Sequence, residues 1–590
     1  MMLVLFSSFS LVAAEITELI NDGYIEINSD NEAEYESMLI EYIDHPLLWE
    51  ETGQKAIEDL PVNYFLQSSL VLFHKNNKSI KSWREFQEKS GFSHLEMETI
   101  KLFFRLQKPE TISFKLYNFN ELRKDEQFVL HKNLLRFVAR HPGNWQFRAV
   151  AERDRGEPHI YDHKNFALSS PPVFNNQLQI WLGSFRLNWG TGLFYNSNPM
   201  NLMLNTGTPS LYRASSQFRS YGGSDESNYL FGTAIKLATK SVNFFSFYAK
   251  NRLDCRFEGP SVSSVDMTGF HSTELQLENR DKLRKSSYAL GINKIFDNLE
   301  FGVLFHRSDF NYPLLNFDNK QQLTGISGYH SWQSAAFSIS GEIAVAGNRT
   351  IGLTQSLQYR TKEFRLGIGA RYIEPGFHSF SGSILRNFGG QVENEKGYYA
   401  FIGLKPGKFT KIAFYSDYYS RIIPAAIGAD LDRGSDSGFY LRQRTGGRGS
   451  MEFKISRKND TQTIKTTYSL RVKTRVNRNI SLNNRVILIS ATDGKESDQA
   501  YNSYLNMEFN RIDLNFGTTH YFADQYRIYL YEPGIPFRFN MVSLGGSGHH
   551  YFVAIQYHFN PSIECYFTAR QYTKALSDKY SLQLQLLVAL

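Results

Sequence analysis

The chain has 590 residues, a formal net charge of +7 and two cysteines, Cys255 and Cys565, so a framework of several disulfides is excluded and at most one bridge is possible. Aromatic residues make up 15% of the sequence, yet the mean hydropathy is −0.38. A soluble protein would bury so many rings in a core, whereas a transmembrane barrel presents them to lipid around a polar interior.

The first residues, "MMLVLFSSFSLVAAE", form an apolar run that ends in small residues. This pattern predicts a signal peptide over residues 1–14, with cleavage after Ala14. No Lys or Arg precedes the run, so a misassigned start or a buried helix is the alternative. No later run approaches the roughly 18 apolar residues that a spanning helix needs, so any membrane crossing would use strands.

Residues 15–44 form an acidic lead segment, which we expect to be helical, and acidic residues dominate as far as Asp59. The stretch "HLEMETIKLFFRL" then places Leu95, Ile100 and Phe103 on one face of a helix. Short helices interrupted by prolines and Gly91 predict a small α-helical domain over residues 45–108.

Residues 45–104 carry a resemblance to a known module. The landmarks are "HPL" at 45–47, "LP" at 60–61, the linker "SIKSWREFQEKSGF" and the hairpin "GFS" at 91–93. The segment resembles the tandem helix-hairpin-helix module of competence DNA receptors. It is more similar still to the version that precedes a large outer-membrane barrel in Bacteroidota proteins.

The resemblance implies a phosphate-contact hairpin, because the glycine turns of such modules offer free backbone N–H groups at a helix N-terminus. The residues of that hairpin would be Lys89, Gly91, Phe92 and Ser93. The first hairpin, "LPVNYFLQSS", lacks glycine, and the acidic surroundings oppose duplex binding. We therefore expect a periplasmic docking or structural module, with DNA binding as the alternative.

The remaining residues, 109–590, repeat one pattern. In "IGLTQSLQYRTKEFRLGIGARY" two runs of alternating apolar and polar residues flank a short polar turn, which predicts a β-hairpin. Similar pairs surround short turns near residues 297, 406, 478, 510 and 560, and irregular stretches separate them at about 253–284, 308–330, 374–395, 418–437 and 531–547. Short turns alternating with long loops predict a mainly β protein, an antiparallel outer-membrane barrel of about 20–24 strands.

One strand pattern, "WLGSFRLNWGTGLF" at 181–194, is unusually long and aromatic. We expect Trp181, Phe185, Leu187 and Trp189 to face lipid, and Arg186 to face a lumen. A soluble β-sandwich is the alternative. This segment, "RASSQFRSYGGSDESNYLFGTAIKL" at 213–237 and "YLYEPGIP" at 529–536 resemble recurrent segments of the same Bacteroidota barrel family.

Basic residues at inward positions predict a positive lumen lining that favours anionic solutes. The set is Arg186, Lys236, Arg360, Arg365, Arg371, Arg471, Lys473, Arg475 and Arg485. The alternative is that these residues pair with inward acids such as Glu300, Glu508 and Asp513 and simply pack a closed barrel.

No catalytic site is predicted. His520, Asp524, His549 and His550 lie near expected strand ends, but no motif joins a nucleophile to a base. "GGSGHH" at 545–550 lacks the ending of a phosphate loop, and no spacing of His, Cys and Asp indicates a metal site. We expect no cofactor.

The sequence thus predicts an outer-membrane protein in contact with lipid, whose residues 15–108 lie in the periplasm and bind another envelope protein. Its function would be a channel, transport or envelope-assembly role without catalysis. The alternative is a component of DNA uptake that uses the helix-hairpin-helix module.

Overall fold

The structure is a computed structural model. It describes residues 19, 25, 39–58, 60–108, 110–125, 128–157, 161–175, 177–196, 214–267, 269, 271, 273–334, 336–388, 392–424, 430–445, 449–460, 463–477, 479–491, 497–535, 540–560, 562–574 and 578–590. The predicted signal peptide, residues 1–14, and most of the acidic lead segment lie outside the described residues.

The first described elements form a small helical module, residues 39–108. Its elements are β1 (Leu47–Leu48), η2 (Trp49–Glu51), α3 (Gln54–Glu58), α4 (Tyr64–Asn76), α5 (Trp83–Ser90), α6 (His94–Phe103) and β2 (Phe104–Arg105), and β1 pairs in parallel with β2. Asn63, Ser82 and Ser93 cap α4, α5 and α6 by accepting backbone N–H bonds. The described part of the chain holds no helix long and apolar enough to cross a membrane.

A closed barrel follows the module. Its strands are β3 (Ser113–Asp125), β4 (Phe128–Arg140), β5 (Gln146–Arg153), β6 (His163–Ser169), β7 (Leu178–Gly190), β8 (Ser215–Ser220), β9 (Leu230–Ala238), β10 (Val242–Glu258), β11 (Ser261–Asp266), β12 (Leu283–Phe296), β13 (Leu299–Leu314), β14 (Lys320–Gln333), β15 (Phe337–Ala346), β16 (Ile351–Arg360), β17 (Phe364–Ile373), β18 (Glu395–Leu404), β19 (Thr410–Ser420), β20 (Arg433–Arg444), β21 (Gly449–Asn459), β22 (Ile464–Arg475), β23 (Ile480–Ala491), β24 (Asp498–Glu508), β25 (Ile512–Tyr531), β26 (Met541–Asn560), β27 (Ile563–Lys574) and β28 (Asp578–Ala589). The short helices α7 (Glu274–Asn279) and η4 (Leu315–Phe317) lie between strands.

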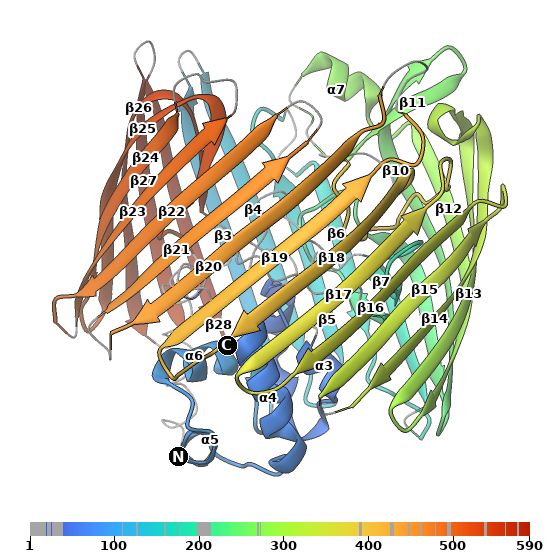
Figure 1. Cartoon of the computed structure of the whole chain (residues 1–590), viewed down its shortest axis with the longest axis horizontal. Coiled ribbons are helices and arrows are strands. Elements are labelled where there is room, and N and C mark those ends of the chain that lie inside the picture. The colour runs from blue at the N-terminus through green and yellow to red at the C-terminus, as the bar shows by residue number, and fades with distance from the viewer. Residues whose placement is uncertain are drawn as a thin grey trace.

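Within the described residues, 24 antiparallel strands make up the barrel wall, which confirms the predicted fold class and strand range. β7 pairs directly with β9 and β10 with β12, so β8 and β11 are additions to the wall. The last strand, β28, closes the barrel on β3. Figure 1 shows the tilted strands, with α3 to α6 at one end and α7 and β11 at the other.

The two ends of the barrel differ as the sequence predicted. Figure 1 shows α7, which precedes β12, at the end opposite the helical module, so the short turn Asp297-Asn298 between β12 and β13 lies at the end that holds the module. We call this end the turn end. The opposite end, the loop end, carries the longer connections, among them residues 267–282, 374–394 and 532–540. The stretch 308–330 was predicted as a loop, but that prediction is wrong, because β13 and β14 occupy most of it.

The strands alternate between two environments. Along β16 and β17 every second residue is buried, and the residues between them are exposed or only partly covered. The exposed set around the wall is apolar and includes Leu290, Val303, Ile343 and Ile368, with 64, 47, 51 and 49% of their surface exposed. The buried set is largely small or polar, for example Ser356 and Arg365. The barrel therefore has an apolar outer band around a polar interior.

The expectation that the aromatic residues of β7 face lipid is wrong. Trp181, Phe185, Leu187 and Trp189 are all buried and pack with Phe218 of β8 and the interior of the wall. Trp181 precedes Gly183 and lies on the inward face of the wall, since its neighbour Leu182 is the exposed residue. At Gly183, whose φ is +82°, the strand bends, so that the second half of β7, with Phe185, Leu187 and Trp189, leaves the wall and pairs with β8. A bend of this kind follows from one backbone angle and does not change the period-two pattern.

Candidate functional site

The helical module is seated in the lumen at the turn end. Asp44 is buried and contacts three side chains of the wall strands β3 and β4. The hydroxyl of Tyr117 donates to its Oδ1 at 2.6 Å, Lys115 Nζ lies 3.4 Å away, and Arg136 forms an ion pair with its Oδ2. Beside it, Arg148 of β5 donates from Nε to Nε2 of His45 at 3.0 Å. A row of polar contacts thus joins the module to three neighbouring strands.

Positive charges of the wall lower the pKa values of both module residues at this contact. Burial by itself would raise the pKa of Asp44, but the charges of Arg136 and Lys115 hold it below its usual value. Burial, reinforced by the positive charge of Arg148, holds the pKa of His45 well below its usual value. Asp44 is therefore ionised and His45 neutral when the module is docked.

Apolar contacts back the polar row. Tyr117 and Val138 of the wall belong to the same buried cluster as Trp49, Phe86 and Phe103 of the module. On the opposite wall, Lys411 of β19 places Nζ 5.3 Å from the ring centre of Phe65. The module therefore contacts both sides of the turn-end mouth.

A second inserted segment, the inner hairpin, consists of residues 184–196 and 214–229. Its tip is held by Glu342 of β15, whose Oε2 accepts the backbone N–H groups of Thr191 at 2.7 Å, Gly192 at 3.0 Å and Leu193 at 3.2 Å. Thr191 Oγ1 also donates to the same oxygen at 3.0 Å. One buried carboxylate thus satisfies a whole turn of the hairpin.

Aromatic contacts hold the rest of the inner hairpin. Trp189 lies edge-on to Phe245 and Tyr329 of the wall, with ring centres 5.4 and 5.3 Å apart. Phe194 stacks on Phe377, which belongs to the loop-end connection 374–394, at 5.3 Å. This connection also reaches the lumen, because residues 195 and 381 form a β-bridge.

A third segment enters from β25 and β26. The pairing of these strands shifts register between Ala523 and Ile528, and beyond the shift Ile528 and Leu530 are buried against the wall. Ile535 packs with Phe119 and Tyr566 of the interior. The three segments that the sequence singled out as recurrent, at 181–194, 213–237 and 529–536, therefore contribute to the lumen filling through their described residues.

The predicted basic lining is distributed over this interior. Arg371 pairs with Glu395 at 2.6 Å and with Asp417 at 2.9 Å. The acids considered from sequence were Glu300, Glu508 and Asp513. Glu395 and Asp417 are different residues, and only the pairing of the strands brings them next to Arg371. Arg186 lies on the inner hairpin, with its guanidinium carbon 4.2 Å from the ring centre of Tyr221.

The other members of the predicted lining occupy varied surroundings. Arg365 donates to Gln358 at 2.5 Å, Arg471 to Asn483 at 3.0 Å and Arg485 to Ser469 at 3.3 Å. Arg360 and Lys473 are buried, Lys236 lies over the ring of Phe245, and Arg475 is exposed near the turn end. The basic residues thus surround the lumen at several heights and do not form one compact site.

The predicted phosphate-contact hairpin is the short turn between α5 and α6. Gly91 ends α5 with a φ of 66°, and Ser93 begins α6. The expected anion position is already occupied, since the carboxylate of Glu96 accepts the backbone N–H and hydroxyl of Ser93 at 2.9 and 2.8 Å. Lys89 pairs with Glu85 at 2.8 Å, and Phe92 packs on the ring of Phe73.

The histidines considered from sequence fall into two groups. His520 and His549 are exposed on the outer face, with their Nδ1 atoms 2.5 Å apart. His550 is buried and contacts Glu532 at 2.8 Å. Cys255 and Cys565 are both free thiols.

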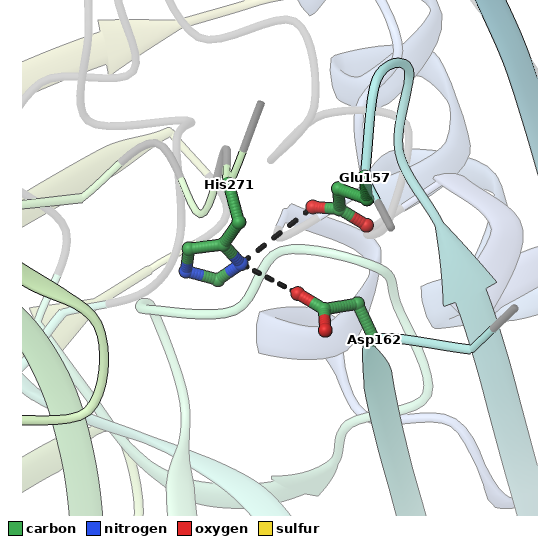
Figure 2. A group of neighbouring side chains, drawn as sticks. All are labelled: Glu157, Asp162 and His271. Atoms are coloured by element: carbon green, nitrogen blue, oxygen red, sulfur yellow. Dashed lines mark hydrogen bonds and ion pairs between the residues drawn. The ribbon is translucent and has the colours of Figure 1, made fainter. Parts of the chain in front are cut away.

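A further cluster at the loop end had no signal in the sequence. Glu157, Asp162 and His271 come from two connections far apart along the chain, and one oxygen or nitrogen of each lies within 4.8 Å of the others (Figure 2). Burial favours the neutral ring, but the neighbouring carboxylates, Asp254 foremost, raise the pKa of His271 to about 11. Burial also raises the pKa of nearby Glu226, to about 9. The spacing of these residues in the sequence matches no metal-binding motif. They come together only when the barrel closes.

The chain matches no family model and no curated protein. Among solved structures it is similar to the siderophore receptor PirA from Acinetobacter baumannii, with 7% identity and a TM-score of 0.41 over 82% of each chain. It is similar to the ferric enterobactin receptor PfeA from Pseudomonas aeruginosa, with 6% identity and a TM-score of 0.43 over 82% of this chain and 81% of that one. The copper transporter OprC shows 8% identity and a TM-score of 0.41 over 82% of each chain.

Proposed function

We propose that the protein is an outer-membrane transport barrel in its closed state, with residues 15–108 as a periplasmic plug that leaves its seat when the barrel opens. The outer surface of the barrel supports a location in a membrane. A band of exposed apolar side chains surrounds the wall, and soluble monomers rarely expose contiguous apolar surface of this extent. Lipid is the environment that such a band fits.

The size of the barrel supports a transport role. Barrels of 16–18 strands already leave an aqueous channel, and barrels of about 22 strands need inserted chain to fill them. Here 24 strands surround the inner hairpin, the connection 374–394 and the helical module. A barrel that served only as a membrane anchor would not need so wide a lumen or so much inserted chain.

The observation that carries the proposal is the way the module meets the wall. Asp44 reaches Lys115, Tyr117 and Arg136 through ion pairs and a hydrogen bond. Water can replace these polar contacts when the module leaves. The basic lining would then meet the solute, which favours an anion.

The experiment is to purify the protein from outer membranes and record conductance in planar bilayers. We compare the full chain, a variant lacking residues 15–108, and the same deletion combined with Glu342→Ala, which releases the inner hairpin. We expect the full chain to be silent and conductance to rise in the deletions, most of all in the combined variant. Heat-modifiable mobility on gels confirms that each barrel is folded.

A barrel that stays silent in all three forms would reject transport and favour the assembly role, in which the module binds another envelope protein. A point variant sharpens the comparison. Asp44→Asn weakens only the seat of the module, and Glu88→Gln, which removes an exposed ion pair with Arg84 on α5, is its control. We expect openings in Asp44→Asn and none in Glu88→Gln.

DNA uptake through the hairpin at Gly91 is the second candidate that the sequence raised. The capping of Ser93 by Glu96 and the pairing of Lys89 with Glu85 oppose it, since a phosphate would have to displace one carboxylate and compete with another. We therefore favour the plug role of the module over DNA binding.

A further inference from the structure

The barrel wall contains a seam on its loop-end half. β6 pairs with β7 only at residues 167–169, opposite 181–183. Above this point β7 turns inward at Gly183 and β9 pairs with β7 no further than Phe185. Among the described residues, the part of β6 between Ala167 and the loop end therefore forms no backbone hydrogen-bond ladder on the side that faces β9. The rings of Phe166 and Phe231 meet across this gap, with their centres 5.6 Å apart.

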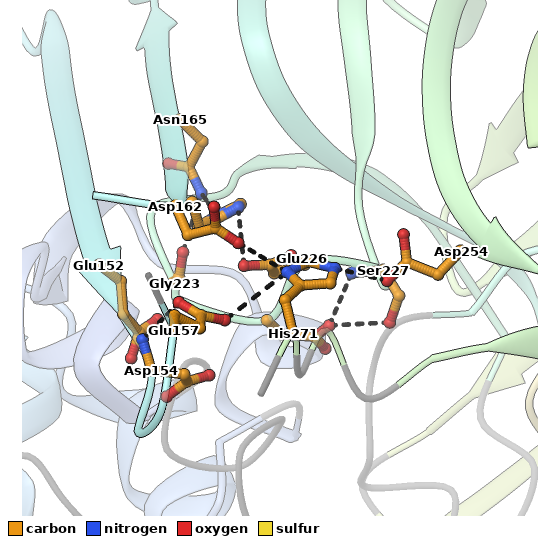
Figure 3. Close-up of polar contacts among 12 residues, drawn as sticks. Glu152, Asp154, Glu157, Asp162, Asn165, Gly223, Glu226, Ser227, Asp254 and His271 are labelled. Atoms are coloured by element: carbon orange, nitrogen blue, oxygen red, sulfur yellow. Dashed lines mark hydrogen bonds and ion pairs between the residues drawn. The ribbon is translucent and has the colours of Figure 1, made fainter. Parts of the chain in front are cut away.

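Charged side chains from both sides converge above the seam (Figure 3). Glu157 and Asp162 belong to the connection between β5 and β6, on one side. Asp254 of β10 and His271, which precedes α7, belong to the other side, and Glu226 comes from the inner hairpin. The cluster therefore spans the gap that the hydrogen-bond ladder leaves open.

Carboxylates surround both ring nitrogens of His271. Its Nδ1 lies 2.6 Å from Asp162 Oδ2 and 3.6 Å from Glu157 Oε1. Its other ring nitrogen, Nε2, lies 2.8 Å from Asp254 Oδ2, and ligating histidines commonly donate their second N–H to a carboxylate in this way. Arg280 holds Asp162 in place through a contact of 2.5 Å to its other oxygen.

Glu157 supplies an independent observation. The residue is 2% exposed, its Oε2 accepts the backbone N–H of Asp154 at 2.7 Å, and its Oε1 has no hydrogen-bond partner among the described residues. Figure 2 shows that this oxygen points at the ring of His271. The contact to His271 Nδ1, at 3.6 Å, is an ion pair and leaves the hydrogen-bonding capacity of this buried oxygen unused.

We propose that Glu157, Asp162 and His271 bind a divalent cation of the class that accepts both imidazole and carboxylate, such as Zn²⁺ or Mn²⁺, and that this ion clasps the seam. The ion takes the place of the proton on Nδ1, and Asp254 stays hydrogen-bonded to Nε2 as the positioning residue. Since the ligands come from both sides of the gap, binding joins β6 to the connection that leads from β10 to β12. This role is independent of whether the lumen opens.

The test uses the full chain in detergent, stripped with a chelator and dialysed. Isothermal titration with Zn²⁺, Mn²⁺, Ca²⁺ and Mg²⁺ measures affinity, and the unfolding midpoint is followed on gels by heat modifiability. We expect one equivalent of Zn²⁺ or Mn²⁺ to bind and to raise the midpoint. Glu157→Gln, which breaks no hydrogen bond of Oε1, should weaken binding by at least about 100-fold, and Asp254→Asn by about tenfold.

The control is His520→Ala with His549→Ala, which removes the exposed histidine pair on the outer face, where Zn²⁺ could also bind. We expect the double variant to keep the one equivalent and the midpoint shift. The proposal is overturned if no divalent ion binds, if Glu157→Gln binds as tightly as the natural chain, or if the stoichiometry falls to zero in the double variant. His271→Gln provides a second ligand variant should Glu157→Gln fold poorly.

Discussion

Glu342 accepts the backbone N–H of Gly192 at 3.0 Å, across a separation of 150 residues in the chain. The same oxygen accepts the neighbouring N–H groups of Thr191 and Leu193. A carboxylate of the wall thus fixes the tip of a hairpin that has left the wall. This single contact links the closure of the lumen to the architecture of the barrel.

Glu342→Ala should loosen the inner hairpin. The substitution removes the carboxylate that accepts three N–H groups, at a cost of about 1–3 kcal/mol for each buried group left unsatisfied, whereas the N–H of Gly192 keeps its contact of 3.2 Å to the carbonyl of Trp189. We expect a lower unfolding midpoint and faster proteolytic cleavage between residues 190 and 229. Thr354→Val, which removes only the hydroxyl contact to Thr191, is the graded control and should have a much smaller effect. Equal effects of the two variants would contradict this role of Glu342.

Gly183 should tolerate no side chain. Its φ is +82°, and a Cβ would lie 2.2 Å from the carbonyl oxygen of Phe166, so both the backbone and the neighbouring strand forbid it. We expect Gly183→Val to prevent assembly of the barrel, seen as loss of the heat-modifiable band. Gly259→Asn is the matched control, because Gly259 also has a positive φ but open space around it. A normally assembled Gly183→Val barrel would show that β7 does not need this bend.

Acid should release the helical module. The pKa of His45 is lowered in the docked state, so the undocked state binds more protons once the pH falls below about 6.5. Docking is therefore most stable above that pH and weakens as the pH falls toward the pKa that His45 has in the docked state. The pKa of Asp44 is also lowered, so protonation of Asp44 weakens docking only below about pH 4.

Hydrogen exchange of α4 to α6, measured on the full chain at pH 7.5 and pH 5.0, checks this prediction. We expect faster exchange at pH 5.0 after correction for the intrinsic rate. His45→Gln should remove most of the difference, because glutamine does not titrate. A pH difference that persists unchanged in His45→Gln would assign the effect to another group.

The full chain should not bind duplex DNA appreciably at physiological salt. Nonspecific affinity comes from Lys and Arg that neutralise phosphates, and here Lys89 is paired while Glu96 occupies the N-terminus of α6. Fluorescence anisotropy with a labelled duplex, at low and physiological salt, measures this. Tight binding at physiological salt that disappears in Gly91→Val would restore the DNA-uptake hypothesis, since valine disfavours the left-handed φ of 66° at that position.

The sequence by itself determined the barrel. Alternation with a period of two, as in the hairpin of β16 and β17, records on which side of the wall each side chain lies, because a strand needs no distant partner to set that period. Turn residues between the runs likewise mark the turn end. The helices of the module were also visible, since their spacing and caps are local.

Only the tertiary structure decided what fills the barrel. The face of β7 that carries Trp189 is aromatic whether it meets lipid or a packed lumen, and the choice depends on one backbone angle at Gly183 and on Glu342, which is distant in sequence. The acids that pair with Arg371 and the cluster at His271 depend in the same way on strands and loops that meet only when the barrel closes. The periodicity of a sequence shows that a side chain is shielded from water, but not whether lipid or the packed lumen shields it.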